Sequence, residues 1–153
     1  MSSIHMSTYR WIESDVPIEL EIRQVYGFIF DLDGRILILD DEGIYNLPGG
    51  RPENGESTVE TLIREVREEV QVSIASIEYL GYQLIDGDEK FAQVRLICQV
   101  EQIFPIAEDP STGRIYKRIW IQPNLANDLL GWGKSGGQQI DSAIESASKW
   151  RAK

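Results

Sequence analysis

Residues 50–72, GRPENGESTVETLIREVREEVQV, decide the fold of this 153-residue chain. Their apolar positions recur at i, i+3, i+4, i+7 and i+11, a pattern that predicts one helix with a single buried stripe. The stripe consists of Val59, Leu62, Ile63, Val66 and Val70. Ser57, followed three residues later by Glu60, has the spacing of a capping box. The segment therefore predicts an amphipathic helix that begins near residue 57, after a loop that contains Gly50.

The charged face of this helix carries the functional signal. Glu65, Glu68 and Glu69 stand at i, i+3 and i+4, so their carboxylates project from one side of the helix. Three like charges repel one another, and a hard divalent cation such as Mg²⁺ would remove that repulsion. The alternative is a solvated acidic face, which is the commoner explanation for this spacing taken alone. The loop in front of the helix decides between the two.

The loop and the helix together resemble the Nudix box. Its pattern is glycine, five residues, glutamate, seven residues, arginine-glutamate, an aliphatic residue, one residue, glutamate-glutamate, one residue, glycine and an aliphatic residue. Eight of its nine fixed positions match, namely Gly50, Glu56, Arg64, Glu65, Val66, Glu68, Glu69 and Val72. Gln71 replaces the usual second glycine, where the helix ends. We expect this change to cost an easy left-handed cap, on the order of 1 kcal/mol, and not a catalytic group.

The resemblance implies hydrolysis of a nucleoside diphosphate linked to another moiety, with Mg²⁺ or Mn²⁺ as cofactor. It implies that the metal ligands are Glu65, Glu68, Glu69 and the carbonyl of Gly49. Arg64 is expected to orient a box carboxylate through a charge-assisted hydrogen bond, with a surface ion pair as the alternative.

Other roles stay more open. Glu56 is expected to brace the loop, or to act only as a first-turn partner of the helix dipole. The general base differs among members of the family: Glu65 is the first candidate and Glu108, in a later loop, the second. Arg51, Lys117 and Arg118 are candidates for contacts with substrate phosphates, although a solvated strand face is the alternative for Lys117 and Arg118.

The substrate is predicted only by elimination. The markers of ADP-ribose, diadenosine polyphosphate, NADH and coenzyme A hydrolases are missing downstream of the box. The remaining prediction is a nucleoside triphosphate pyrophosphohydrolase, with an ADP-ribose or nucleotide-sugar hydrolase as the alternative. A non-hydrolytic nucleotide-binding sensor domain is the alternative from another class. Five aromatic residues could stack on a base, although most are expected in the core: Tyr26, Phe28, Tyr82, Phe91 and Trp120.

The rest of the chain alternates between strands and helices. Strands are predicted over 20–30, 35–39, 72–84, 91–103 and 114–121, and helices over 125–130 and 138–150, separated by a glycine-rich loop at 131–137. This order predicts an α/β fold, and with the resemblance an α/β/α sandwich with a mixed sheet. Residues 1–10 are predicted to be a disordered start, and residues 11–153 a single domain.

Composition limits the partners. The net charge is −10, with 25 acidic and 15 basic residues, which argues against binding to nucleic acid through phosphate neutralisation. Only residues 109–153 have an excess of basic residues, seven against four acidic ones. No apolar run reaches membrane-spanning length, and the single cysteine, Cys98, has no internal partner for a disulfide. The expectation is a cytoplasmic enzyme with a small nucleotide substrate and no membrane partner; a homodimer is an open possibility.

Overall fold

The computed structural model describes residues 6–151. Eight strands form one sheet: β1 (Thr8–Ile12), β2 (Ile22–Phe30), β3 (Ile36–Asp41), β4 (Ile44–Asn46), β5 (Gly49–Gly50), β6 (Val72–Asp86), β7 (Lys90–Ile103) and β8 (Lys117–Ile121). Three helices complete the fold: α1 (Thr58–Val70), α2 (Pro123–Leu130) and α3 (Gly133–Arg151). All five predicted strands are confirmed, with shifted ends, as β2, β3, β6, β7 and β8.

The sheet is mixed. Its order is β1-β6-β7-β2-β3-β4, with β5 paired to β2 and β8 paired to β3. The long β6–β7 hairpin is antiparallel, whereas β2 and β7 run parallel from Ile22 opposite Ala92 to Phe30 opposite Gln99. Among the strand pairs of the described residues, β2 and β7 form the one parallel pair. It places the N-terminal hairpin β2–β3 beside strands that follow α1 in the sequence.

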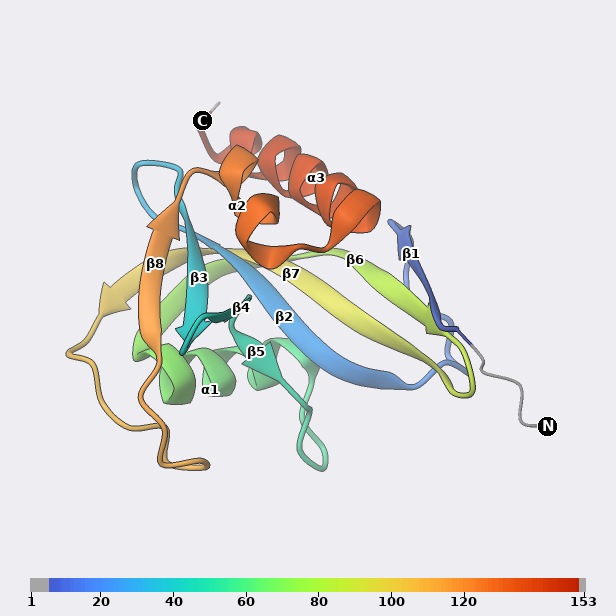
Figure 1. Ribbon diagram of the computed structural model, residues 1–153, viewed down its shortest axis with the longest axis horizontal. Helices are drawn as coiled ribbons and strands as arrows, with labels where there is room; N and C mark the ends of the chain where they lie inside the picture. The colour runs from blue at the N-terminus through green and yellow to red at the C-terminus, as the bar shows by residue number, and fades with distance from the viewer. Residues whose placement is uncertain (1–5, 152–153) are drawn as a thin grey trace.

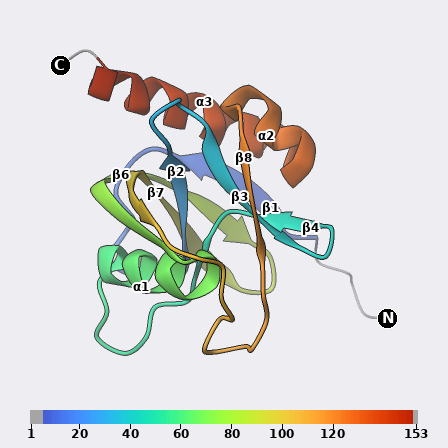
Figure 2. The same cartoon turned by 90° about the vertical axis from the view of Figure 1, so that its left-hand side faces the viewer.

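Helices cover both faces of the sheet. Figures 1 and 2 show α1 on one side and α2 with α3 on the other. Leu62, Val66 and Val70 of α1 pack into a core with Val25 and Ile29 of β2. A second buried cluster joins inward-facing strand residues to Ala126 and Leu130 of α2 and to Ile140 and Ala143 of α3. The predicted α/β/α sandwich with a mixed sheet is therefore confirmed.

Three predictions about local structure need correction. Thr8–Arg10 were predicted to be disordered, but they belong to β1 and pair with residues 84–86 of β6; residues 1–5 lie outside the described part. Val59 and Ile63 are largely exposed, while Thr61 is buried in their place. The buried side of the helix is therefore the one that carries Leu62, Val66 and Val70, and Val59 and Ile63 lie at its solvent-exposed edge.

The glycine-rich segment at 131–137 was also predicted wrongly as a loop, because α3 begins at Gly133. Asn127 of α2 holds its start, accepting from the Trp132 N–H at 3.2 Å and donating to the Gly133 carbonyl at 2.9 Å. A side chain on Gly136 would collide with the Asn127 amide. Close packing of α2 against α3, and not flexibility, explains this glycine. Across the described residues, no helix is long and apolar enough to span a membrane.

Candidate functional site

Arg64 is the centre of a charged site on α1. Its Nε and Nη2 donate to the two oxygens of Glu56 at 2.7 and 2.9 Å, and Nη1 donates to Glu65 at 2.9 Å. Glu68 also lies within 3.5 Å of Nη1. Nη2 donates in addition to the backbone carbonyl of Arg51 at 3.1 Å. These charge-assisted bonds lower the pKa of Glu56 to about 2, chiefly because of Arg64, and raise the pKa of Arg64.

The capped start of α1 fixes Glu56 for this role. Ser57 accepts from the Glu60 N–H and Glu60 accepts from the Ser57 N–H, which completes the predicted capping box. Glu56 also accepts from the Glu53 N–H and from the Thr61 hydroxyl. It therefore braces both the loop and the first turn of the helix. The alternative role as a simple dipole partner does not account for these contacts.

The Pro48-Gly49-Gly50 segment brings backbone close to the carboxylates. The Gly49 N–H donates to Glu69 at 2.8 Å. Gly49 has a φ of 153°, and a Cβ there would collide with the carbonyl of Val25. A Cβ on Gly50 would lie 2.6 Å from the carboxyl carbon of Glu65. Only glycine at position 50 leaves room for the Glu65 carboxylate, which gives the first glycine of the box a physical reason.

Burial and mutual repulsion shift two of the glutamates. Burial raises the pKa of Glu69 to about 8, although the Gly49 N–H opposes the shift, and the neighbouring Glu65, Asp109 and Glu68 raise it further. The pKa of Glu65 is also raised, first by burial, while Arg64 opposes the shift. The site thus keeps two carboxyl groups where the charged form is disfavoured.

The carboxylate oxygens of Glu65, Glu68 and Glu69 are the candidate ligands of a divalent cation. Within residues 6–151, no three acidic, histidine or cysteine groups are gathered closely enough to hold a metal ion. Glu65 and Glu68 turn instead toward Arg64, and Glu69 turns toward the Gly49 N–H. The chemistry of the donor set fits, because crowded and partly buried carboxylate oxygens suit Mg²⁺ or Mn²⁺ and a cation would lower their pKa values. The predicted ligand role of the Gly49 carbonyl stays a prediction.

A loop from the far half of the chain approaches the same carboxylates. Asp109 is buried and raises the pKa of both Glu65 and Glu69. The neighbouring Ser111 donates to Glu68 at 3.3 Å. Gln71 anchors this loop, since its carbonyl accepts from the Phe104 N–H and its side chain accepts from the Ala107 N–H. Glu108, the second candidate for the general base, is exposed, whereas the adjacent Asp109 faces the site.

The three basic residues proposed to contact phosphates are spread apart. Arg118 donates through Nη1 to the carbonyls of Val70 and Phe104, at 3.1 and 2.7 Å, so it ties the end of α1 to the loop after β7. Arg51 and Lys117 are exposed. Arg118 is thus held by backbone carbonyls, and the substrate roles of Arg51 and Lys117 stay predictions.

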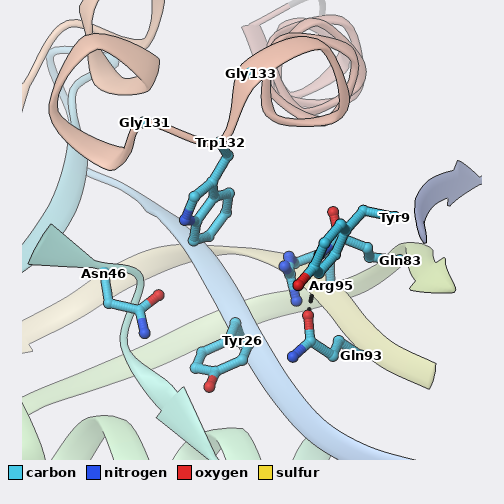
Figure 3. A pocket seen from close by; sticks show the side chains of 9 residues that line it. All are labelled: Tyr9, Tyr26, Asn46, Gln83, Gln93, Arg95, Gly131, Trp132 and Gly133. Atoms are coloured by element: carbon cyan, nitrogen blue, oxygen red, sulfur yellow. Dashed lines mark hydrogen bonds between the residues drawn. The ribbon is translucent and has the colours of Figure 1, made fainter. Parts of the chain in front are cut away.

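A cavity of about 550 Å³ has Tyr26 in its wall. Figure 3 shows Tyr26 from β2 below Trp132, which hangs from the connection between α2 and α3. The cavity is lined by Tyr9, Tyr26, Asn46, Gln83, Gln93, Arg95, Gly131, Trp132 and Gly133. The pKa of Tyr26 is raised, first by burial and in addition by the negative charges of Glu69 and Glu65. Tyr26 therefore lines the cavity and lies beside Gly49, the residue whose N–H donates to Glu69.

Several of these residues were missed from the sequence. Among the aromatic candidates, Tyr26 lines the cavity, whereas Phe28 is fully buried in the core. Trp132 and Arg95 were not identified, because one lay in a segment predicted to be a loop and the other inside a strand. The signal for Arg95 was a single charge in the apolar run of β7. The signal for Asp109 was its place in a loop rich in proline and glycine, and that signal did not distinguish it from Glu108.

A family model described as NUDIX domain matches residues 21–140. Over 69 residues the chain is 36% identical to the NAD-capped RNA hydrolase NudC of Pseudomonas fluorescens (strain Pf0-1), covering 40% of this chain and 25% of that protein. Over 41 residues it is 49% identical to NudC of Pseudomonas entomophila (strain L48), covering 27% and 15%. The matches thus span a quarter or less of these relatives.

Solved structures share the fold at low sequence identity. The crystal structure of the Bacillus subtilis pyrophosphohydrolase BsRppH has a TM-score of 0.74, covers 92% of each chain and is 19% identical. A likeness over nearly the whole of both chains supports the arrangement of layers described above.

Proposed function

The chain belongs to the NUDIX domain family, as the sequence predicted, and from that premise we propose that it is a metal-dependent pyrophosphohydrolase whose substrate is a nucleoside triphosphate. The observation that carries the proposal is the Arg64 cluster, in which one guanidinium holds Glu56, Glu65 and Glu68 beside the Gly50 backbone. All five charged positions of the box are present, and Glu56, Glu65 and Glu68 meet at Arg64. The retention of these carboxylates favours hydrolysis over a sensor domain without hydrolytic activity.

Glu65, Glu68 and Glu69 would hold Mg²⁺ or Mn²⁺, with the Gly49 carbonyl as the further proposed ligand. The cation would supply neutralisation of the pyrophosphate oxygens and a more acidic water. Arg64 orients the Glu65 carboxylate, and Glu65 is the proposed acceptor of the proton from the attacking water. Asp109 is the candidate from the later loop, since it lies close enough to influence both Glu65 and Glu69.

The test replaces carboxylates without changing their size. Glu68→Gln and Glu69→Gln should each lower kcat by roughly 10²-fold or more, since removal of one group that stabilises developing charge has effects of about this size. Glu101→Gln, on the exposed end of β7, is the matched control and should keep full activity. Circular dichroism should show an unchanged fold. Unchanged Mg²⁺-dependent hydrolysis in both box variants would sink the assignment.

A panel of substrates separates the remaining alternatives. Pyrophosphate or phosphate release from triphosphates supports the main proposal. ADP-ribose or a nucleotide sugar yields two monoesters, which release phosphate only after a phosphatase is added. Nucleotide binding without hydrolysis of any substrate in the panel indicates a sensor domain.

A second candidate substrate is a nucleotide-linked 5′ end of RNA. The observation in its favour is the local identity to the two NAD-capped RNA hydrolases. The net charge of −10 makes extended contacts to an RNA backbone unfavourable, so any such contact should be confined to the terminal nucleotides. Cytoplasmic location and a homodimer stay proposals; fractionation of cells and size-exclusion chromatography with light scattering would test them.

A further inference from the structure

Arg95 is a buried charge with no carboxylate partner in the described part of the chain. It lies on β7, is 1% exposed, and is the single charged residue among those that line the cavity. Its Nε donates to Gln139 at 2.8 Å, whereas its Nη1 has no partner. Burial lowers the pKa of Arg95 to about 10. A guanidinium in this state leaves donor capacity that the protein itself does not use.

Aromatic rings offset part of the cost of burying this charge. The guanidinium lies 5.1 Å from the centroid of the Tyr26 ring and 5.0 Å from that of Trp132. Arg23 provides the contrast within the same sheet. It also stacks on an aromatic ring, that of Phe91 at 3.9 Å, but it forms ion pairs with Glu21 and Glu89. Arg23 thus combines stacking with carboxylate partners, whereas Arg95 has the stacking and no carboxylate partner among the described residues.

The neighbouring amides hold the cavity wall in place. Gln139 donates to Gln83 at 3.0 Å, and Gln83 donates to Gln93 at 3.1 Å. Figure 3 shows Gln83 and Gln93 on one side of the guanidinium, and Trp132 and Tyr26 on the other. The lining residues include no Asp or Glu. A ligand would therefore meet flat aromatic faces, neutral amides and one cation.

We propose that the cavity binds the nucleobase of the substrate and that Arg95 selects a base with an acceptor edge, as in guanine. This proposal deepens the proposed function and rests on it, because the base must belong to the nucleotide that is hydrolysed at the Arg64 cluster. Tyr26 lines the cavity and also lies beside Gly49, whose N–H donates to Glu69, so the cavity and the charged site are neighbours. Trp132 and Tyr26 supply stacking surfaces that any base can use.

The selectivity comes from the arginine. A guanidinium has donors and no acceptor. Guanine presents two adjacent acceptors, O6 and N7, whereas adenine presents the N6 amino donor in place of O6. An adenine in the same position would place its N6 amino group, a donor, opposite an N–H donor of the guanidinium. A phosphate group is a poorer match, because its tight binding usually needs several converging cations or backbone N–H groups and this cavity offers one guanidinium whose Nε is already engaged.

The experiment compares kcat/KM for GTP, ITP and ATP in the presence of Mg²⁺. ITP keeps O6 and N7 and lacks only the 2-amino group, so it should be used like GTP. Both should exceed ATP by about tenfold or more, the discrimination expected from one good arginine–base contact. Arg95→Gln should bring the ratio of GTP to ATP close to one. Arg23→Gln, the stacked arginine outside the cavity, is the matched control and should leave the ratio unchanged.

Binding without metal separates the two proposals. Isothermal titration with GMP and AMP should show about tenfold tighter binding of GMP by the wild-type protein. GMP preference without hydrolysis of any triphosphate would support the base site and overturn the proposed function. Hydrolysis with equal kcat/KM for GTP and ATP, and equal binding of GMP and AMP, would overturn the base site alone. Displacement of GMP by millimolar inorganic phosphate in a manner that depends on Arg95 would also overturn it.

A second variant covers the case in which Arg95→Gln does not fold. Trp132→Ala removes a partly exposed ring in the connection between α2 and α3. It should weaken GMP binding by about tenfold, since stacking on one aromatic side chain contributes about 1–3 kcal/mol per base. Unchanged GMP affinity in this variant would count against the cavity as the base site.

Discussion

Arg64 and Arg95 lie at the two ligand-facing regions of the molecule and have opposite surroundings. Arg64, on α1, bonds to Glu56 and Glu65, and its pKa is raised. Arg95, on β7 facing the cavity, has no carboxylate partner in residues 6–151, and its pKa is lowered to about 10. The first guanidinium is saturated by the protein and can only position its neighbours. The second keeps donors free, which suits a ligand.

The largest effect should come from removing the guanidinium of Arg64, with removal of the Arg95 guanidinium as the comparison. Arg64→Gln leaves Glu56 and Glu65 without their main partner and should lower the free energy of unfolding. It should also lower kcat by roughly 10²-fold, because a misplaced catalytic group costs about this much. Arg95→Met should instead be neutral or stabilising, since replacing an uncompensated buried charge by an apolar side chain removes a desolvation penalty.

Urea unfolding of both variants measures this difference directly. Turnover of the preferred triphosphate gives the second readout for Arg64→Gln. If both substitutions destabilise the protein equally, Arg95 has an internal structural role and the contrast between the two arginines is wrong.

Gly50→Ala should have the next largest effect. A Cβ at this position would lie 2.6 Å from the carboxyl carbon of Glu65, so the carboxylate must move. We expect kcat to fall by about tenfold or more, with little change in thermal stability. Gly137→Ala is the matched control, because the nearest atom to a Cβ there is 3.9 Å away. Equal activity in the two variants would show that the position of Glu65 is not critical.

The same contrast explains what could be predicted from the sequence. The Arg64 cluster lies within one loop and one helix, so the resemblance to the Nudix box led to the expectation that Arg64 bonds to a box carboxylate, although not that Glu56 is its bidentate partner. The cavity around Arg95 joins β1, β2, β4, β6, β7 and the start of α3. Such a site depends on pairing over long sequence separations, which no local pattern encodes. Asp109 and Glu108 show the same limit on a smaller scale, since their order in a loop does not reveal which side chain turns inward.

The pH dependence of stability should differ between two glutamates of the charged site. Glu69 has a pKa of about 8 in the folded protein against an ordinary value of 4.5. The native state therefore holds a proton that the unfolded state releases between these values. Its contribution is fully present below pH 4.5 and is lost as the pH rises through about 8. Glu69→Gln should flatten this decline, measured by urea unfolding without metal from pH 5 to 8.5.

Glu56 should behave in the opposite sense. Its pKa of about 2 lies below the ordinary value because of Arg64, so its contribution is present above pH 4.5 and is lost as the pH falls through 2. Glu56→Gln should reduce stability at pH 7 more than at pH 3. A parallel pH profile for the wild type and both variants would mean that these carboxyl groups do not have the environments described.

The smallest effect concerns Gln71, where this chain departs from the family pattern. Gln71 is in the left-handed conformation, with φ of 54° and ψ of 48°, so the position does require the geometry that glycine adopts easily. Its side chain offsets the strain by donating to the Glu68 carbonyl at 2.9 Å and accepting from the Ala107 N–H at 3.1 Å. Gln71→Gly relieves the strain but loses both bonds, so the free energy of unfolding should change by about 1 kcal/mol or less.

Gln71→Ala separates the two contributions, because it keeps the strain and loses the bonds. It should be about 1–2 kcal/mol less stable than the wild type, and less stable than Gln71→Gly. Thermal unfolding of the three proteins gives the order. Both variants also release the loop that carries Asp109 and Ser111, and a matching small fall in kcat would link that loop to the carboxylates of α1. If Gln71→Ala is as stable as the wild type, the glutamine side chain is incidental, and the loop is held by Arg118 through the Val70 and Phe104 carbonyls alone.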